Sequence, residues 1–401
     1  MDIRRAVCDC QPIDTEDTMM ETNFSAEKLT KERGDYIFLA VLVLLVGLGL
    51  AALFSSSFYY GETRFGDPLY FLKRQLILIV LGIALGFFAS RLSLSFIRRL
   101  TPALVIFSLA LTALTFVPGL GRTTMGAKRW IYIFGYSFQP SELAKLTVIL
   151  YLAHIFSKKE DKMDEFAKSV LPPLVICSAF VILVYLQNDF STAFFIFFLV
   201  LLMFFIAKIR FVYFILLAVV GIPLAAILLF TKEHRVQRLM AFLDPMKDPI
   251  GAGFQVNASR SALMNGGLWG TGLGEGAKKM GGLPEAHSDF IFAVLGEEMG
   301  FFGVLFIVAV FIAFAFRGYT AAVKSSSKFG YYLAFGLTSS ILYQALLNIA
   351  VVSGLVPATG IPLPFFSSGG SSIVVTLIMC GLILNVSRSP LEERKRERVY
   401  E

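Results

Sequence analysis

The chain has 401 residues, of which 56% are hydrophobic and only 16% are charged, and its formal net charge is +7 at pH 7. A soluble protein of this length is about half apolar and about a quarter charged, so the composition excludes an ordinary soluble enzyme and indicates a polytopic membrane protein. Basic residues in such proteins mainly set orientation and attract anionic lipid, so the positive charge does not indicate a nucleic-acid partner. The four cysteines lack the spacing of a disulfide framework or a zinc site.

Polar tails are predicted at both ends of the chain. Residues 1–35 contain no apolar segment that resembles a signal peptide, and we expect a disordered cytoplasmic tail there. Residues 388–401 form a second cytoplasmic tail, which is rich in basic residues. The membrane domain is therefore predicted to cover residues 36–387.

Ten apolar segments follow one another between these tails. A helix needs about 20 apolar residues to cross a bilayer, and the candidates are residues 36–58, 70–90, 100–118, 141–157, 169–187, 190–207, 211–230, 289–316, 329–354 and 367–387. They predict an all-α polytopic membrane protein of about ten transmembrane helices. Residues 231–288 are expected to form a large extracytoplasmic loop between the seventh and eighth helices.

The distribution of lysine and arginine predicts that both termini lie in the cytoplasm, because most basic residues near short loops then fall inside. Six basic residues in short outer loops oppose this rule: Arg64, Lys73, Arg74, Arg122, Lys128 and Arg129. Their charged ends either extend toward lipid headgroups or form a cationic cradle for a phosphate-bearing substrate.

The second outer loop and the helix that follows it combine cations with an aromatic side chain. Lys128 and Arg129 precede Trp130, which fits either a binding site or an ordinary aromatic belt at the membrane interface. A helix is expected to begin near residue 140. Glu142 and Lys145 share one face of it, and we expect them to pair facing a cavity, although a purely structural pair is the alternative.

The long outer loop is rich in glycine between residues 251 and 282. Its GGLWGTGLGEG segment follows no predicted strand and lacks a Walker lysine, so a nucleotide-binding fold is not supported. A re-entrant or amphipathic segment lying on the membrane is expected instead. Arg260 in this loop is a further candidate for phosphate binding.

The most distinctive stretch is GLPEAHSDFIFAVLGEE, residues 282–298, which carries acids into an apolar helix. An acid at a membrane helix centre costs about 3 kcal/mol, so a function is the first explanation for it. Asp289 is the candidate catalytic group, with a helix N-cap as the alternative. Glu285 and His287 lie beside it, and His287 fits either a second acid/base group or a structural residue.

Two further acids follow deeper in the same helix. On an ideal helix Glu297 lies about 80° around the axis from Asp289 and Glu298 about 180°. Only one of them is therefore expected to face the cavity of Asp289, and we favour Glu297.

The last outer loop, residues 358–372, contains prolines that prevent a helix. Its hydroxyl groups, Ser371 among them, either line a polar cavity or belong to a plain turn.

Five motifs together resemble the SEDS family of bacterial cell-wall proteins (shape, elongation, division and sporulation), which includes FtsW, RodA and SpoVE. They are AKRW at 127–130, QPSELAK at 139–145, FLDPMKDPIGAGFQ at 242–255, LPEAHSDFIFAVLGEE at 283–298 and GIPLPFFSSGGSS at 360–372. The second and third motifs are more similar to the division-type FtsW branch than to RodA. Asn188, Ser191 and Ser368 depart from the proline, glycine and tyrosine that are usual in the family.

The resemblance implies a peptidoglycan glycosyltransferase in the bacterial cytoplasmic membrane, with its active site on the extracytoplasmic side. Its substrate would be lipid II, a disaccharide-peptide on undecaprenyl pyrophosphate, and its partners a class B penicillin-binding transpeptidase and other divisome proteins. A septal role in cell division is expected, and Asp289 is implied to be essential. An elongation-type polymerase, a lipid II flippase and a non-catalytic scaffold are the alternatives.

Transfer of a sugar from a lipid pyrophosphate needs a base and positive charge. We expect Asp289 to act as the base or as a ligand of a divalent cation, Mg²⁺ or Mn²⁺, with Glu142 and Lys145 completing the catalytic set. The residues expected to bind the substrate or its pyrophosphate are Arg74, Lys128, Arg129, Trp130, Arg260, Glu285, His287, Glu297 and Ser371.

Overall fold

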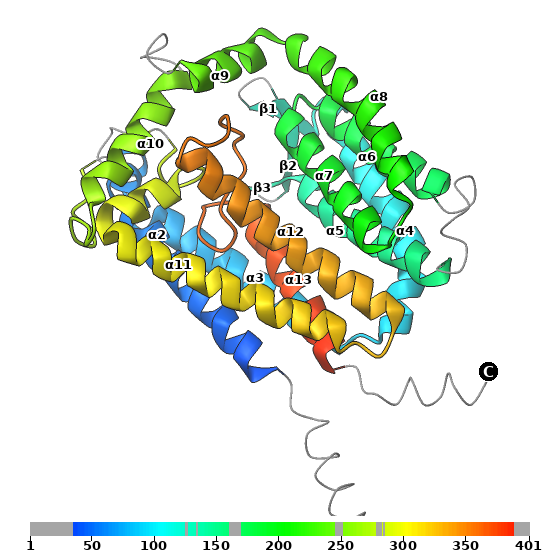
Figure 1. Ribbon diagram of the computed structural model, residues 1–401. Helices are drawn as coiled ribbons and strands as arrows, with labels where there is room; N and C mark the ends of the chain where they lie inside the picture. Colours follow the sequence, from blue (N-terminus) through cyan, green and yellow to red (C-terminus); the bar gives the residue numbers. More distant parts are fainter. Residues whose placement is uncertain are drawn as a thin grey trace, which may run out of the picture.

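A computed structural model describes residues 35–124, 127–133, 135–159, 170–244, 252–277, 283 and 285–388, and most of them are helical (Figure 1). The helices are α2 (Tyr36–Phe65), α3 (Tyr70–Arg91), α4 (Leu94–Leu114), α5 (Pro140–Lys158), α6 (Leu171–Leu186), α7 (Phe190–Ile206), α8 (Phe211–Phe230), α9 (Glu233–Leu243), α10 (Ala252–Gly266), α11 (Ile291–Val323), α12 (Lys328–Val352) and α13 (Gly370–Arg388). The predicted tails lie outside the described residues, apart from Asp35 and Arg388.

A helix overlaps each of the ten predicted apolar segments, which confirms a helical polytopic membrane protein. Seven helices are long and apolar enough to cross a membrane: α2, α3, α4, α8, α11, α12 and α13. Helices α6 and α7 are apolar but shorter. Helix α5 has a less apolar sequence because Glu142 and Lys145 lie in its first turns.

Side-chain caps set several helix boundaries. Asp35 accepts a hydrogen bond from the Phe38 N–H (2.9 Å) and begins α2, which ends at Gly66 in a left-handed conformation (φ 67°). Asp189 accepts from the Thr192 N–H (3.1 Å) and begins α7 directly after α6. These local signals explain how an almost uniformly apolar sequence is divided into separate helices.

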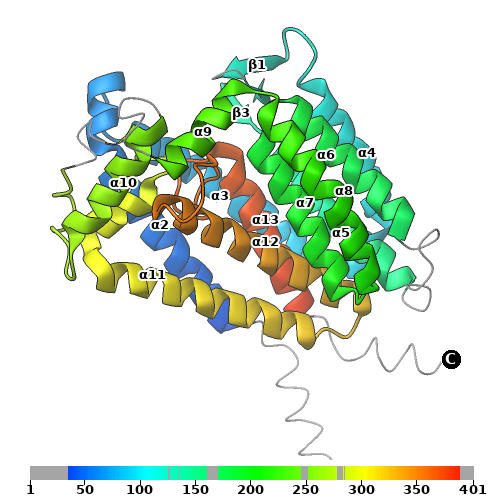
Figure 2. The ribbon, with the colours of Figure 1, turned by 45° about the horizontal axis from the view of Figure 1, so that its top comes forward.

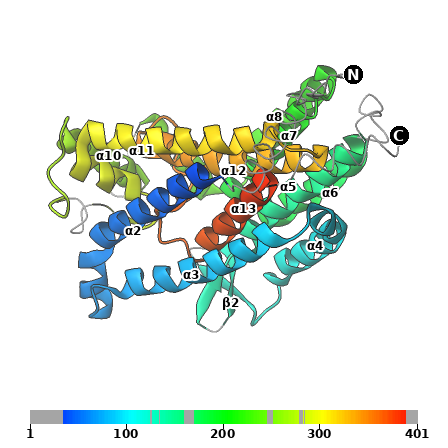
Figure 3. The same cartoon turned by 90° about the horizontal axis from the view of Figure 1, so that it is seen from below.

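Helices α3 and α13 pack most closely, side by side in Figure 3. A Cβ atom on Gly86 would lie 2.6 Å from the carbonyl oxygen of Leu377, and one on Gly381 would overlap the backbone of Gly86. Small residues let membrane helices approach to backbone contact. This contact joins an N-terminal and a C-terminal helix into one core, which also includes α2, α11 and α12.

Helix α8 lies at the edge of the bundle, beside α6 and α7 (Figure 2). None of the residues in its most apolar window is buried within the protein. Helix α9 then leads away from it at the end of the bundle that carries the strands, and α10 packs against α11. The segment predicted as a long outer loop, residues 231–288, therefore contains two helices, and the glycines from residue 267 onward follow the second of them.

A small antiparallel sheet, which the all-α prediction missed, lies between α4 and α5. Its strands are β1 (Gly121–Thr124), β2 (Ala127–Ile133) and β3 (Tyr136–Phe138), in the order β1-β2-β3. The β-branched and aromatic residues of RWIYI and the following Gly135 (φ 81°) are typical of a hairpin. The sheet marks one end of the bundle, called here the sheet end.

The segment predicted as a span at residues 289–316 lies within α11, which contains a break at Gly300 (φ 66°, ψ −167°). The glycine-rich segment 267–272 fills the break. The N–H groups of Phe301 and Phe302 donate to the carbonyls of Gly267 and Leu268, at 3.0 and 3.3 Å. In return, the carbonyls before the break accept from the N–H groups of Thr271 and Gly272. Backbone groups that the helix leaves unpaired are thus satisfied by the loop.

We predict that Gly381→Ala destabilises the protein by about 1–3 kcal/mol, because the new methyl group overpacks the α3–α13 contact. Gly47→Ala is the matched control, since no atom lies within 4 Å of a Cβ added there, and alanine is the better helix former. Thermal unfolding in detergent should show a lower midpoint for the first variant and an equal or higher midpoint for the second. Equal midpoints for both variants would contradict the packing described.

Candidate active site

Asp289 lies in the turn that precedes α11, at the sheet end, and its side chain is partly exposed. The Ser288 hydroxyl donates to its Oδ1 (3.1 Å), and the Asn348 amide donates to its backbone carbonyl (2.8 Å). A Cβ on Gly360 (φ 71°) would lie 3.2 Å from its Oδ2. The residue before the helix is Phe290, and no side-chain hydrogen bond caps this end, so the N-cap explanation for Asp289 is wrong.

Two guanidinium groups and a second carboxylate act on Asp289. Arg129 of β2 and Arg238 of α9 attract its charge, and Asp189 of the α6–α7 turn repels it. Arg129 Nη1 also lies 3.4 Å from Asp189 Oδ2. Because the four groups come from four separate segments, the fold itself assembles this charge cluster.

Asp189 is held firmly, with only 3% of its surface exposed. It caps α7 and also accepts a hydrogen bond from the Gln139 amide (3.1 Å) at the start of α5. The preceding Asn188 has a left-handed backbone (φ 64°), which asparagine tolerates and the proline usual in the SEDS family cannot adopt. Asp189 therefore ties Arg129 and α5 to the α6–α7 turn.

The environment of Asp289 raises its pKa above the ordinary value of 3.8. Burial is the main cause, and the Ser288 hydrogen bond and the charges of Arg129 and Arg238 oppose it. The pKa of Glu285 is also raised, by burial and by repulsion from Asp289. A carboxylate whose pKa moves toward neutral is better suited to accept a proton in catalysis.

His287 packs away from this cluster. Its ring stacks on Tyr60 of α2, with ring centroids 4.8 Å apart, and contacts Phe71 of α3 at 4.5 Å. Burial lowers the pKa of His287 to about 4. The imidazole is therefore neutral at physiological pH, and its contacts favour the structural role over the acid/base role.

Glu142 and Lys145 form the predicted pair, with 2.9 Å between Oε2 and Nζ. Their side chains are only 6% and 4% exposed, so they are enclosed by protein and do not line an open cleft. Lys145 also donates to Gln344 Oε1 (2.7 Å), and Gln344 in turn donates to the Pro362 carbonyl (2.9 Å). One turn further along α12, Asn348 donates to the backbone carbonyl of Asp289. The Glu142–Lys145 pair therefore contacts residues that support the site and does not line its surface.

The other candidate residues occupy several different places. Arg129 joins the cluster, whereas its neighbour Lys128 is exposed and Trp130 is half-buried, with its ring 5.9 Å from the Arg129 guanidinium. Arg260 donates to the Gly354 carbonyl (2.9 Å) at the end of α12. Arg74 is half-buried on α3.

Ser371 is a framework residue, because its hydroxyl accepts the Gln139 N–H (3.0 Å) at the start of α5. Glu297 and Glu298 are also enclosed, at 1% and 2% exposure. Asn265 donates to Glu297 (3.3 Å), and Ser55 donates to Glu298 (2.7 Å).

One of the two glutamates, Glu297, was expected to face the cavity of Asp289, but the structure places both side chains against the glycine-rich loop. Both side chains lie within 3.3 Å of a Cβ placed on Gly276. The glycine-rich segment that fills the break in α11 curls back over the end of the first half of the helix, and ideal helix geometry does not anticipate this contact. In this structure the two glutamates contact the scaffold through Asn265 and Ser55.

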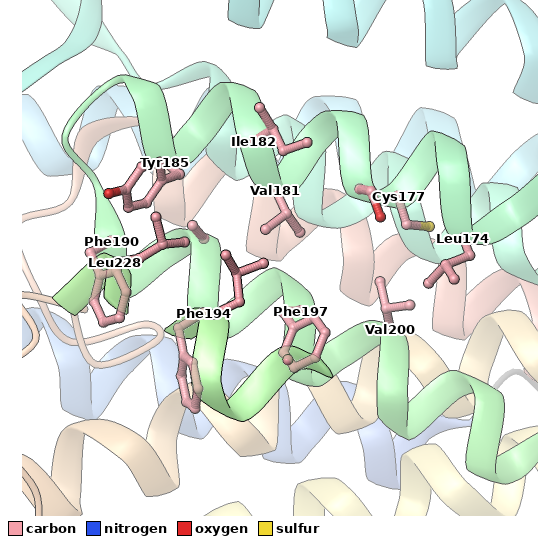
Figure 4. Close-up of a pocket in the computed structure, with 14 residues that line it drawn as sticks. Leu174, Cys177, Val181, Ile182, Tyr185, Phe190, Phe194, Phe197, Val200 and Leu228 are labelled. Carbon is pink, nitrogen blue, oxygen red and sulfur yellow. The ribbon is translucent and has the colours of Figure 1, made fainter. Parts of the chain in front are cut away.

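An apolar groove runs between α6, α7 and α8 (Figure 4). Its volume is about 240 Å³, and its lining includes Cys177, Val181, Phe194, Phe197 and Leu224. Tyr185 and Phe190 line its end near the sheet, where the Arg235 guanidinium of α9 lies 4.7 and 5.2 Å from their ring centroids. The groove is suited to an alkyl chain because its walls are almost entirely hydrocarbon.

A divalent cation fits this site only when a bound substrate supplies some of the oxygen atoms that coordinate it. Among the described residues, no three histidine, cysteine or acidic side chains form a metal-binding group. Asp289 and Glu285 are nevertheless close enough to repel each other. Because Mg²⁺ is commonly held by one or two carboxylates and by substrate phosphates, these two side chains fit such an ion when a phosphorylated substrate supplies the remaining oxygens.

Sequence reasoning missed Arg238, Asp189, Gln344 and Asn348. The polar residues Gln344 and Asn348 within an apolar span, four positions apart on one helical face, are a signal that could have been used. Arg238 carries no such signal, because only the path of α9 brings it to the site.

Comparison with known proteins finds a family described as cell cycle protein, comprising FtsW, RodA and SpoVE, whose model matches residues 35–391. A probable peptidoglycan glycosyltransferase FtsW from Borreliella burgdorferi is 42% identical over 88% of this chain and 96% of its own length. The stage V sporulation protein E of Bacillus subtilis is 36% identical over 89% of this chain and 98% of its own.

Solved structures agree with the sequence relatives. A chain from a study of polymerization and crosslinking by a peptidoglycan synthase complex superposes with a TM-score of 0.74 at 28% identity, covering 88% of this chain and 98% of that one. The rod shape determining protein RodA of Thermus thermophilus gives 0.66 at 27% identity, with coverages of 88% and 97%.

We predict that His287 makes stability sensitive to acid. Its pKa is about 4 when folded and about 6.5 when unfolded, so the unfolded state takes up the proton first as pH falls below 6.5. Stability is therefore lost between pH 6.5 and 4, by about 3 kcal/mol in full. His287→Phe retains the ring stacking and removes the titration, so its thermal midpoint should fall less between pH 7.5 and 4.5. The same pH dependence in both proteins would contradict the burial of a neutral imidazole.

Proposed function

Because the chain belongs to the FtsW, RodA and SpoVE family of cell cycle proteins, we propose that it is a peptidoglycan glycosyltransferase that polymerises lipid II into glycan strands. The observation that carries the proposal is the partly exposed Asp289, attracted by Arg129 and Arg238 at one end of a membrane bundle. The names of its FtsW relatives favour the division-type branch and a role in septal cell-wall synthesis.

The bundle has ten transmembrane helices in the proposed topology, with both termini in the cytoplasm. The positive-inside rule supports this orientation, which places the sheet end on the outer face of the bacterial cytoplasmic membrane. The pairing of α6 with α7 through a tight turn favours counting both short helices as spans. Asp289 then faces a substrate whose lipid tail lies in the outer leaflet.

Asp289 acts as the general base of the proposed reaction. It takes the proton from the acceptor sugar hydroxyl, whose oxygen forms the new bond to the anomeric carbon of the donor. The bond between that carbon and the pyrophosphate oxygen breaks, and its electron pair leaves with the pyrophosphate. The guanidiniums of Arg129 and Arg238 stabilise this developing charge, and one such well-placed group contributes about 3 kcal/mol.

A divalent cation, held by Asp289 and Glu285 together with the substrate, would add Lewis-acid stabilisation of the pyrophosphate. The groove between α6, α7 and α8 accommodates part of a polyprenyl tail, because its apolar walls end near Arg235 on the same helix as Arg238. Glu142 and Lys145 are positioning residues: through Gln344 and the loop at Pro362 they support the segments around Asp289.

A class B penicillin-binding transpeptidase is the proposed partner, with other divisome proteins around the pair. The similarity to a chain from a study of polymerization and crosslinking by a synthase complex supports this pairing.

The rival function is lipid II transport. The position of Asp289 and its charged neighbours at one end of the bundle, rather than at its midplane, favours surface chemistry over transport.

We predict that Asp289→Asn abolishes glycan polymerisation by the purified protein with its transpeptidase partner, because the amide cannot accept the proton. The measurement is a gel assay of glycan length, run beside a translocation assay with fluorescent lipid II. Asp67→Asn is the control, since Asp67 pairs with exposed Lys73 in a connection that the proposed topology also places outside. Full-length glycan from Asp289→Asn, or translocation without polymer from the unaltered protein, would overturn the proposal.

As the pH is lowered, the polymerisation rate should begin to fall at a pH above 3.8, the ordinary pKa of aspartate. This is expected because the pKa of Asp289 is raised and the base works only when it is deprotonated. Asp189→Asn removes a repelling negative charge, which lowers the pKa of Asp289. The pH at which the rate falls should therefore be lower in this variant, whereas Asp67→Asn should leave that pH unchanged. A shift to higher pH would contradict the assigned cluster.

Removal of divalent ions should slow polymerisation, with Mg²⁺ restoring the rate. Glu285→Gln should raise the Mg²⁺ concentration needed for half-maximal rate, because one of the two carboxylates is lost. Rates that are unchanged after chelation would leave Asp289 as base alone and remove the cation from the account.

A further inference from the structure

A second polar cavity lies at the end of the bundle opposite Asp289, where α4 and α12 begin and α5 ends. Its volume is about 320 Å³. Ser95, Arg98 and Arg99 of α4, His154 of α5, and Ser327 and Phe329 at the start of α12 line it. Figure 1 shows the α11–α12 connection beside this end of α4. The proposed topology places the cavity on the cytoplasmic side, away from the glycosyltransferase site.

The cavity is strongly cationic. Within the described part of the chain, no carboxylate forms an ion pair with Arg98 or Arg99. Lys158, the last residue of α5, adds its charge near His154, as does Arg98. The Nδ1 atom of His154 is buried and has no hydrogen-bond partner among the residues that the structure describes. Two guanidiniums line the cavity and one ammonium lies near it, without a counter-charge among the described residues, and the imidazole of His154 also hydrogen-bonds the backbone of Arg98.

The beginnings of two long helices meet at the same cavity. Ser93 caps α4 by accepting from the Phe96 N–H (3.3 Å), and Ser327 caps α12 by accepting from the Gly330 N–H (3.0 Å). Each helix presents the positive end of its dipole there. Helix beginnings favour anions, and guanidinium groups match the paired oxygens of a phosphate.

We propose that this cavity binds a phosphate group, carried by an anionic lipid headgroup of the cytoplasmic leaflet or by a free phosphate ion. The inference is independent of the glycosyltransferase assignment, since it uses none of that site's residues. A bound phosphate bridges α4, α5 and α12 and therefore stabilises the folded bundle by an amount that grows with the logarithm of the ligand concentration above Kd. Apolar Leu94 and Phe329 in the lining suit a headgroup at the boundary of the membrane.

The test compares thermal midpoints of the full chain in nanodiscs of phosphatidylcholine alone and with phosphatidylglycerol added. A parallel titration uses inorganic phosphate in phosphatidylcholine nanodiscs. A higher midpoint with phosphatidylglycerol alone identifies the lipid headgroup as the bound phosphate. A higher midpoint with inorganic phosphate identifies the free ion as the ligand. Either result supports the site when Arg98→Gln/Arg99→Gln weakens the apparent affinity at least tenfold. No rise with either ligand would overturn the proposal.

Arg91→Gln is the matched control, because Arg91 ends α3 on the same side of the bundle and does not line the cavity. It should bind as the unaltered protein does. If the double glutamine variant fails to fold, Arg98→Lys/Arg99→Lys keeps both charges and loses the paired donors, and it should still bind more weakly. Binding by the arginine variants that equals binding by Arg91→Gln would also overturn the proposal.

Discussion

At the sheet end of this protein, the guanidiniums of Arg129 and Arg238 attract the carboxylate of Asp289, and the candidate site is built around these charges. A carboxylate taken out of water is costly unless opposite charge and hydrogen bonds replace its solvation. Arg129 comes from the small sheet and Arg238 from the helix after α8, so the compensation is supplied by chain segments far apart in sequence. The site therefore exists only when the bundle, the sheet and α9 are all in place.

The remainder of the fold holds these charges in position. Asn348 fixes the backbone of Asp289, and Gly360 approaches its carboxylate so closely that a side chain there would crowd it. The buried Glu142–Lys145 pair supports the same frame through Gln344. Beyond the start of α11, segment 267–272 replaces two helical hydrogen bonds at Gly300. These contacts are internal and polar, and they connect the segments that form the sheet end of an otherwise apolar bundle.

Much of this arrangement was predictable from sequence, because membrane helices follow from long apolar runs and their caps are local. The choice of Asp289 as a candidate was also accessible from sequence, since an acid entering an apolar helix needs an explanation. The ion pair of Glu142 with Lys145 followed from their spacing on one helical face. These predictions rest on residues close together in the chain, where helix geometry decides which side chains meet.

What sequence reasoning missed depends on contacts between distant segments. Ser371 and Glu297 were assigned to the substrate, yet they bind Gln139 and Asn265 of the scaffold. Arg238 was overlooked because nothing in α9 shows which surface it approaches. The small sheet was missed because its strands are short and lie among apolar helices, although the aromatic and β-branched residues of β2 and the turn at Gly135 indicate a hairpin.

The most direct measurement is a structure of the full chain bound to a lipid-linked disaccharide pyrophosphate and an acceptor sugar. The account predicts that the acceptor hydroxyl lies within hydrogen-bond distance of the Asp289 carboxylate and that the pyrophosphate contacts Arg129 and Arg238. A substrate bound elsewhere, with Asp289 touching only protein, would contradict the central claim.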